Sequence, residues 1–232
     1  MGLRDEKKQA TRTAIADAAL ALFLEKGFDR VTVAEVARAA TVSVNTVFNY
    51  FPTKEDLFFD RQDEVVQRLA RAVRGRTDGE TAATAVHRAF LQRLDHDDPT
   101  LGLQPGAERF WRVVDESPAL MARARLLREL TETALADALA DAPPPDDHMA
   151  AAPPSDTLPP DALPSGDRMA AGPPSDTLPP GDRMAAALIA AADHALHAEI
   201  RERVAGGESP AGIRSAVRAL AGRAFAALDV LG

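Results

Sequence analysis

Apolar residues recur at helical spacing along most of this 232-residue chain, and short polar or glycine-containing stretches separate the apolar runs. The pattern predicts a first helix from about residue 11 to residue 26, which Gly27 ends, and a longer helix from residue 54 to about residue 76. Further amphipathic helices are predicted at residues 81–94, 107–116, 118–140, 183–205 and 209–229. The predicted fold class is therefore all-α.

Three helix starts lie close together between residues 32 and 57. Thr32 is followed three positions later by Glu35, which predicts a capping box in which each side chain accepts a hydrogen bond from the other residue's backbone N–H. Ser43 and Thr53 stand as polar caps before the next two helical runs. Because the first two of these helices are joined by a very short turn, the segment is predicted to be a helix-turn-helix.

The second helix of this motif, residues 43–50, has an apolar face and a polar face. Val47 and Phe51 are predicted to pack beneath it, whereas Asn45, Thr46 and Asn49 lie on the opposite side. An asparagine amide can bind an adenine edge in the major groove, and threonine can bind a phosphate or contact a thymine methyl group. Each of these residues alone can be a solvated surface residue, but the whole set favours contact with DNA.

Lys54 lies in the first turn of the following helix, where the helix dipole disfavours a cation unless an anion is nearby. A DNA phosphate would supply that anion, although a lone lysine there can also be an ordinary surface residue. The predicted DNA-contacting residues are Thr32, Ser43, Val44, Asn45, Thr46, Phe48, Asn49, Tyr50 and Lys54.

A continuous pattern between Arg12 and Leu57 carries a family resemblance. Its members are Ala18, Ala19, Leu22, Phe23, Gly27, Phe28, Thr32, Val36, Ala37, Val42, Ser43, Thr46, Phe48, Tyr50, Phe51, Lys54 and Leu57. This segment resembles the N-terminal DNA-binding domain of the tetracycline-repressor (TetR) family. One departure is Thr41, where the family usually has glycine. Glycine tolerates a positive φ and threonine does not, so the turn is expected to be slightly strained or differently bent.

The resemblance implies a helix-turn-helix head at residues 1–53 and a larger helical body for effector binding and dimerisation at residues 54–232. ERFWRVVDESPALMARARLLREL (108–130) also resembles the C-terminal domains of actinobacterial members. The family analogy implies a homodimer formed through residues 183–205 and 209–229. It also implies a palindromic double-stranded DNA operator, read by the helix at 43–50, and a small-molecule effector whose identity the sequence leaves open. The expected function is a ligand-responsive transcriptional regulator, in most cases a repressor.

An effector pocket is expected to be largely apolar, with a few polar groups. Its candidate lining residues are His87, Phe90, Arg109, Phe110, Trp111 and Met121. The same residues can equally form solid core, so the sequence leaves both interpretations open.

Twelve of the 17 prolines lie between residues 143 and 181, where MAAAPPSDTLPP (149–160) returns as MAAGPPSDTLPP (169–180). Proline removes a backbone donor and blocks helix and sheet ladders, and two copies are too few to stack into a solenoid. The segment is predicted to be a disordered insertion in the helical body. An adaptor-binding role is conceivable, but repeat expansion is the simpler explanation.

The net charge of −8 is unevenly distributed. Residues 1–76 contain 13 Lys and Arg against 11 Asp and Glu, or +2, and the remainder contains 14 against 24, or −10. A mildly basic head on an acidic body suits contact with DNA at one end. The absence of cysteine excludes disulfides and thiolate metal sites, and no apolar run is long enough for a membrane span. The expected location is cytoplasmic.

Two other function classes remain as alternatives. An enzyme is disfavoured because the chain has no nucleophile elbow, P-loop or dinucleotide fingerprint, and no cofactor or metal is predicted. The acidic loop at 95–99, which contains His96, is disfavoured as a metal site because its possible ligands are adjacent in sequence and point in different directions. The third hypothesis is an architectural DNA-binding protein without a small ligand. An operator affinity that no metabolite in a broad screen changes would favour it.

Overall fold

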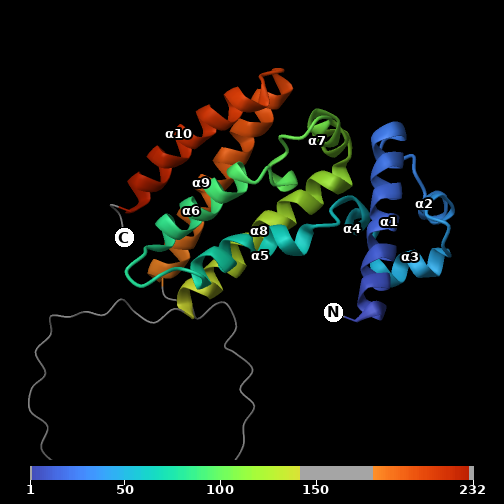
Figure 1. Cartoon of the computed structure of the whole chain (residues 1–232), viewed down its shortest axis with the longest axis horizontal. Coiled ribbons are helices and arrows are strands. Elements are labelled where there is room, and N and C mark those ends of the chain that lie inside the picture. Colours follow the sequence, from blue (N-terminus) through green and yellow to red (C-terminus); the bar gives the residue numbers. More distant parts are fainter. Residues whose placement is uncertain (1, 142–179, 230–232) are drawn as a thin grey trace, which may run out of the picture.

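The computed structural model describes residues 2–141 and 180–229, which form an elongated helical molecule with a smaller head at one end (Figure 1). The helices are α1 Leu3–Lys26, α2 Val33–Ala39, α3 Val44–Tyr50, α4 Lys54–Phe58, α5 Gln62–Arg74, α6 Ala82–Asp95, the 3₁₀ helix η1 Pro99–Leu101, α7 Ala107–Glu116, α8 Pro118–Ala140, α9 Pro180–Ala205 and α10 Pro210–Asp229. The all-α prediction is confirmed. The disordered insertion predicted at 143–181 lies outside the described residues, except for 180 and 181, which belong to α9.

The first helix begins earlier than its apolar pattern indicated. Helical spacing of apolar residues starts near residue 11, but α1 begins at Leu3. Its first turn carries Asp5 and Glu6, whose negative charges are favourable near the positive end of the helix dipole. The Gly2 N–H also donates to the Asp5 carboxylate at 3.3 Å. The basic residues near the N-terminus therefore lie on the first turns of a helix.

The prediction of a single helix from residue 54 to residue 76 is wrong, because the chain forms two helices, α4 and α5, with a break at residues 59–61. The backbone of Phe59 leaves the helical region with φ −98° and ψ 54°. The carbonyl of Asp60 accepts a hydrogen bond from the Arg12 guanidinium at 3.0 Å, so α1 holds the break from outside. The apolar periodicity continues across both pieces and could not reveal this tertiary contact.

Two apolar cores hold the molecule together. The head core is built from α1–α4 and includes the fully buried rings of Phe23 and Phe51. Phe28 and Val31 pack into it beneath the helix-turn-helix. The head core also includes Leu120 of α8, so the body contributes directly to the packing of the head.

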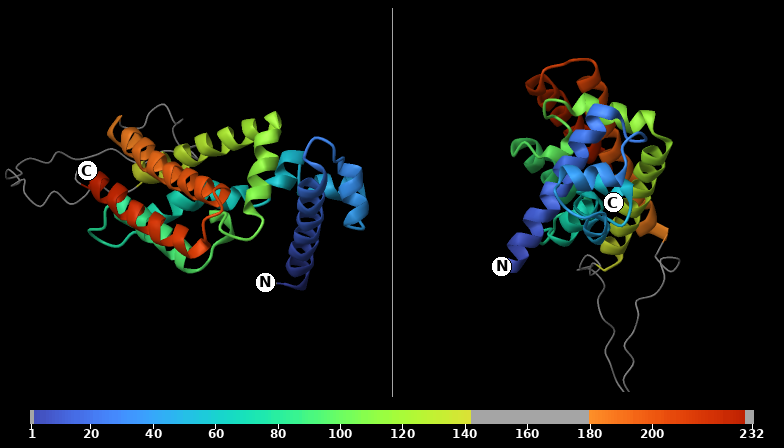
Figure 2. Two further views of the ribbon diagram at one scale, coloured as in Figure 1. Left: turned by 90° about the horizontal axis from the view of Figure 1, so that it is seen from above. Right: turned by 90° about the vertical axis from the view of Figure 1, so that its right-hand side faces the viewer.

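The body core is enclosed by helices that pack in sequence around it. Helix α5 contacts α6 and α8, α9 contacts α8 and α10, and α10 returns to contact α6. Figure 2 shows these helices stacked side by side, with the head projecting from one end and the end of α10 lying at the other. Within residues 2–141 and 180–229, no helix combines the length and apolar character that crossing a membrane requires.

Candidate nucleic-acid interface

The predicted capping boxes are present in the head and fix where its short helices begin. The Glu35 N–H donates to the Thr32 hydroxyl at 3.2 Å, and the Thr32 N–H donates to the Glu35 carboxylate at 2.9 Å. These bonds from Thr32, with the nearby Lys26 ammonium, lower the pKa of Glu35 to about 2. Thr53 and Asp56 form the same arrangement at the start of α4. Because its hydroxyl and N–H are engaged in the cap, Thr32 is held in a defined orientation at the surface.

The turn between α2 and α3 adopts the strained conformation expected from its sequence. Thr41 has φ +57°, in the left-handed region that β-branched residues rarely adopt. The turn is held by a hydrogen bond from the Val42 N–H to the Ala37 carbonyl at 2.9 Å. This compact connection sets the direction in which α3 leaves α2.

Helix α3 presents most of its predicted contact residues to solvent. The Ser43 hydroxyl accepts a hydrogen bond from the Thr46 N–H at 3.0 Å and caps the helix. Val47 is fully buried beneath it, whereas Asn45 and Asn49 are exposed. The helix thus presents two amide side chains, one turn apart, on an anchored scaffold.

Two large apolar side chains are exposed on the same short helix. Val44 is 40 % exposed and Phe48 is 46 % exposed, although each is of a type usually buried in a small domain. Tyr50 is half-buried and packs partly against the head core. An apolar side chain on a DNA-contacting face can touch a thymine methyl group.

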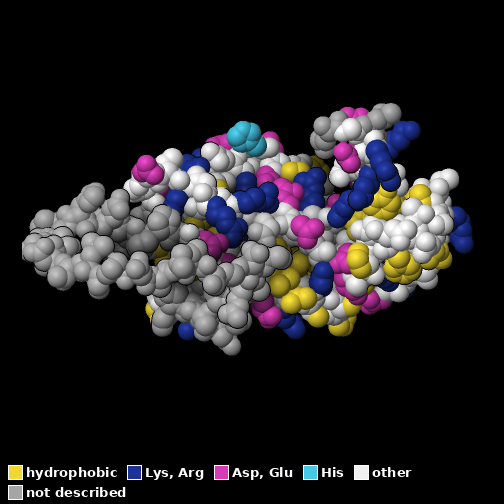
Figure 3. Space-filling model, turned by 90° about the horizontal axis from the view of Figure 1, so that it is seen from below, with side chains coloured by type: hydrophobic (Ala, Val, Ile, Leu, Met, Phe, Trp, Pro, Cys, Tyr) yellow, Lys and Arg dark blue, Asp and Glu magenta, His cyan; other side chains and the backbone are white. Residues whose placement is uncertain are grey.

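A basic groove lies beside α3. Arg4, Lys7 and Lys8 from the start of α1 line it together with Asp5, Thr11 and Tyr50 of α3, around a volume of about 700 Å³. Figure 3 shows basic side chains along one face of the molecule, including its head end. These basic residues lie near Tyr50 because of how α1 and α3 are placed relative to each other. The spacing of apolar residues in the sequence does not indicate that placement.

Lys54 makes contacts within the head. Its ammonium donates to the Phe28 carbonyl at 2.6 Å and lies 4.3 Å from the centre of the Phe28 ring. Partial burial lowers the pKa of Lys54, while the charges of Asp29 and Glu55 act in the opposite direction. An ammonium has three hydrogens, so one bond to a carbonyl leaves donors for a phosphate.

The six candidates for an apolar effector pocket are not gathered around one cavity. His87 and Phe90 lie on α6, where the His87 ring stacks on Phe225 at 5.4 Å and Phe90 belongs to the body core. Burial lowers the pKa of His87, and the charge of Asp229 opposes that effect. His87 is therefore packed against α10, and Phe90 meets the ring of His197 on α9.

The other four candidates lie on α7 and α8. Phe110 stacks on Phe58 of α4 at 4.5 Å, and Trp111 meets Phe110 edge-on at 5.2 Å, so both pack against the head core. Arg109 is exposed, and Met121 is half-buried on α8. Their part in effector binding remains a prediction.

Several polar contacts join head and body, and sequence patterns gave no signal of them. Arg123 of α8 donates to the Asp56 carboxylate at 2.6 Å and to the Gln62 side-chain carbonyl at 2.6 Å. The buried Ser117 hydroxyl donates to Asp29 at 3.0 Å. These partners are separated by more than 60 residues in sequence. The contacts with Asp56 and Asp29 connect α8 and the residue before it to α4 and to the turn between α1 and α2, and the contact with Gln62 ties α8 to the start of α5.

Comparison with known proteins identifies the head. Residues 15–60 match the family model described as bacterial regulatory proteins, tetR family. The head is similar to the helix-turn-helix domain of that family. The matched range includes α2, α3 and α4, so the exposed asparagines lie inside the segment that defines the tetR-family head.

Two curated relatives are named as transcriptional regulators. The HTH-type transcriptional regulator TcmR of Streptomyces glaucescens is 32 % identical over 124 residues, which cover 52 % of this chain and 55 % of that protein. The HTH-type transcriptional regulator LuxR of Vibrio harveyi is 46 % identical over 57 residues, or 25 % of this chain and 26 % of that protein. The chain thus spans about half the length of the first relative and about a quarter of the second.

The whole described fold also has a counterpart among solved structures. Native NalD, described as the secondary repressor of the MexAB-OprM multidrug efflux pump in Pseudomonas aeruginosa, superposes with a TM-score of 0.52 at 20 % identity. The superposition covers 93 % of this chain and 97 % of NalD. The overall helical fold of head and body is therefore shared with that protein.

Proposed function

We propose that this protein is a homodimeric, ligand-responsive repressor that reads a palindromic operator through α3. The observation that carries the proposal is the exposed face of a capped, tetR-family recognition helix. Asn45 and Asn49 are four residues apart, so they lie on the same side of α3 and can reach base edges in one major groove. The buried Val47 beneath them fixes the helix to the head core.

The groove beside α3 supports a second kind of contact with the same duplex. Arg4, Lys7 and Lys8 are exposed on the first turns of α1 and line the groove with Tyr50. Phosphate contacts of this kind set the register of a protein on DNA without reading its sequence. The proposed division of roles therefore assigns orientation to α1 and base reading to α3.

A homodimer is proposed through α9 and α10. Alanines at 191, 195 and 198 are exposed on α9, as are those at 219 and 226 on α10. Small side chains allow two helix pairs to approach closely, as in a four-helix arrangement. Two-fold symmetry would place two copies of α3 in successive major grooves, roughly 34–36 Å apart.

Effector response is proposed to act on that separation. The contacts of Arg123 with Asp56 and of Ser117 with Asp29 transmit a movement of α8 to α4 and to the turn between α1 and α2. An effector can change operator affinity only by its preference for one arrangement of the two heads, which is typically worth about 1–3 kcal/mol.

The test is selection of DNA fragments by the purified protein from a random pool, combined with sedimentation analysis of the free protein and of the complex. The expected results are enrichment of an inverted repeat and a complex containing two chains. A protein that remains a single chain and retains random sequence as well as inverted repeats would contradict the proposal.

A further inference from the structure

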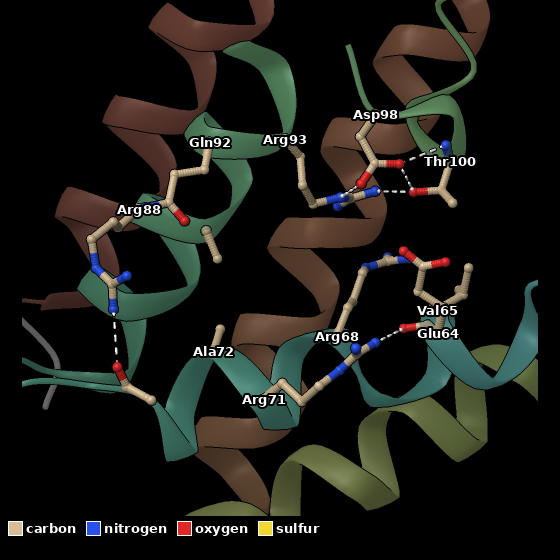
Figure 4. A pocket seen from close by; sticks show the side chains of 12 residues that line it. Glu64, Val65, Arg68, Arg71, Ala72, Arg88, Gln92, Arg93, Asp98 and Thr100 are labelled. Carbon is tan, nitrogen blue, oxygen red and sulfur yellow. Dashed lines mark hydrogen bonds and ion pairs between the residues drawn. The ribbon is translucent and has the colours of Figure 1, made fainter. Parts of the chain in front are cut away.

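A polar cleft opens on the body between α5 and α6. It has a volume of about 390 Å³, within the range of small-molecule sites. Four arginines line it, two from each helix: Arg68, Arg71, Arg88 and Arg93. We call this feature the arginine cleft. Figure 4 shows the four side chains around it, with Glu64 and Val65 at one side.

Three of the four guanidinium groups are held by carboxylates. Arg88 donates to Glu80 at 2.8 Å, Arg93 donates to Asp98 at 3.1 Å, and Arg68 pairs with the buried Asp193 of α9. Arg93 also donates to the Thr100 hydroxyl at 2.8 Å. These bonds already hold the cationic groups in place, so ligand binding does not have to bear the entropic cost of ordering them.

Arg71 differs from the other three. Among the described residues its hydrogen bonds go to main-chain carbonyls of its own helix, those of Glu64 at 2.7 Å and Gln67 at 3.3 Å. Its positive charge is not paired with a carboxylate at ion-pair distance in the described part of the chain. Because a guanidinium has five N–H donors in a planar fork, Arg71 retains donors for an anion.

The wall behind the cleft contains polar atoms with unmet hydrogen-bonding capacity. Within residues 2–141 and 180–229, the Nε of Arg68 and the Oδ1 of Asp193 are buried without a partner. An unsatisfied buried donor on a charged group is costly, and a nearby anion or its bound water can relieve that cost.

His197 of α9 lies behind the same arginines and is neutral at physiological pH. Its Nδ1 lies 2.8 Å from the Asp193 carbonyl, so a proton on Nδ1 is donated to that carbonyl. The other ring nitrogen, Nε2, is then the acceptor and lies 3.4 Å from the Arg93 guanidinium. Burial lowers the pKa of His197 to about 4; Asp193 opposes this shift, and the charges of Arg68 and Arg93 add to it. The cationic character of the cleft therefore comes from guanidinium groups alone and does not change near neutral pH.

The rest of the lining sets the size of the ligand. Ala72 and Ala89 add small apolar surfaces between the arginines, and Glu64 supplies an exposed carboxylate. Glu80, Asp98 and Asp193 each pair with one guanidinium group, so the charge available to an anion is that of Arg71, with the remaining N–H donors of Arg88 and Arg93 beside it. The volume is larger than a lone phosphate needs and leaves room for a small carbon skeleton.

We propose that the arginine cleft binds an organic anion, a small molecule that carries a carboxylate or a phosphate, and that this anion is the effector. The second part rests on the proposed function, whereas binding itself does not. Arg71 is the direct ligand, with Arg88 and Arg93 completing the cationic wall. This assignment replaces a largely apolar effector with a charged one.

The test of binding uses four probes on the full chain: benzoate and phenyl phosphate as anions, and benzamide and phenol as neutral counterparts. Melting temperature and calorimetric affinity are measured at constant ionic strength. The two variants are Arg71→Gln and, as matched control, Arg74→Gln, because Arg74 lies on the same helix but does not line the cleft. Circular dichroism confirms that both variants fold.

The expected result is saturable binding of at least one anion to the wild type and to Arg74→Gln, with none for the neutral probes. Arg71→Gln should weaken that binding at least tenfold. The preferred anion shows whether the natural group is a carboxylate or a phosphate. The proposal would be overturned if each anion bound no better than its neutral counterpart, that is, benzoate no better than benzamide and phenyl phosphate no better than phenol. It would also be overturned if Arg71→Gln and Arg74→Gln bound the anion equally well.

The effector assignment is tested separately with the selected operator. Saturation with the preferred anion should change operator affinity by about fivefold or more. A protein that binds both anion and operator but shows no coupling would overturn the effector assignment and leave the DNA-binding function intact. Anion binding by a protein that selects no DNA would instead retain the site and reject the proposed function.

Discussion

The guanidinium of Arg123 on α8 donates to the buried carboxylate of Asp56 on α4 at 2.6 Å, and this contact joins the body to the helix that follows α3. Asp56 also accepts from Gln62 at 2.8 Å and caps α4 through Thr53. Burial raises the pKa of Asp56, but the hydrogen bonds from Gln62 and Thr53 and the charge of Arg123 outweigh it, and the pKa is lowered overall. The ionised carboxylate is therefore part of the folded state at neutral pH.

Replacing Arg123 with methionine should destabilise the protein by about 1–3 kcal/mol, because the Asp56 carboxylate loses a charged donor while it stays buried. Urea unfolding at neutral pH measures the change, and Arg125→Met on the exposed side of the same helix is the control. A lowered pKa means that the stabilisation is present above the ordinary pKa of aspartate and lost as the pH falls through the folded value. Equal stability of the two variants would show that the ion pair contributes nothing.

Asn49→Ala should weaken binding to the selected operator by roughly 5- to 100-fold and leave binding to random DNA nearly unchanged. The reason is that the proposal assigns base reading to the exposed amides of α3 and sequence-independent phosphate contacts to the basic groove. Titration of both DNAs by fluorescence anisotropy measures the two affinities. Gln67→Ala, which removes an exposed amide from α5, serves as the control. Equal loss on both DNAs would mean that Asn49 does not read bases.

Lys54→Met should reduce the salt dependence of operator binding by about one unit per monomer, because each phosphate contact releases about one counterion. The same variant should also lose about 1–2 kcal/mol of stability, since the ammonium donates to the Phe28 carbonyl at 2.6 Å. Affinity at several salt concentrations and urea unfolding separate the two effects. An unchanged slope with reduced stability would confine Lys54 to a structural role.

Thr41→Gly should stabilise the head by up to about 1 kcal/mol. Relief of the left-handed strain is worth about 1–2 kcal/mol, and the greater freedom of glycine in the unfolded chain offsets part of it. The positive φ of Thr41 and its exposure motivate the change. Thermal unfolding compares it with Thr41→Ala, which keeps a Cβ atom and should gain less. A glycine variant no more stable than the alanine variant would show that the turn is not strained.

His197→Gln should make stability less sensitive to acid. The folded pKa of about 4 lies below that of the unfolded histidine, so the unfolded chain binds more protons between those values. Native stability therefore falls as the pH drops from about 6.5 towards 4, by at most about 3 kcal/mol from this group. Urea unfolding across that interval measures the slope in both proteins. Identical slopes would remove His197 from the acid response.

The helix starts of the head were predictable because their information is local. Thr32 and Glu35, or Ser43 and Thr46, lie within one turn of each other, so residue identity and spacing are sufficient. The apolar period likewise placed α7 and α8 at their observed bounds. The strain at Thr41 was predictable for the same reason, since only one residue's conformational preference is involved.

The candidate effector residues show where such information ends. The sequence predicts Phe110, Trp111, His87 and Phe90 as candidates to line one largely apolar pocket, with solid core as the alternative. In the structure the first two pack towards Phe58 of the head and the other two towards the body core. Helical spacing indicates that a side chain is buried, but it does not indicate which neighbouring helix buries it.

By itself the sequence determined that this chain is helical, that its head carries a capped short helix at residues 44–50 with asparagines on its polar face, and where most helices begin and end. Tertiary structure alone decided the break between α4 and α5, the ion pair of Arg123 with Asp56, and the arginine cleft. The physical reason is distance along the chain: Arg12 holds Asp60 across 48 residues, and Arg68 pairs with Asp193 across 125. Contacts of that separation form only when whole helices pack, so they leave no periodic signal in the sequence.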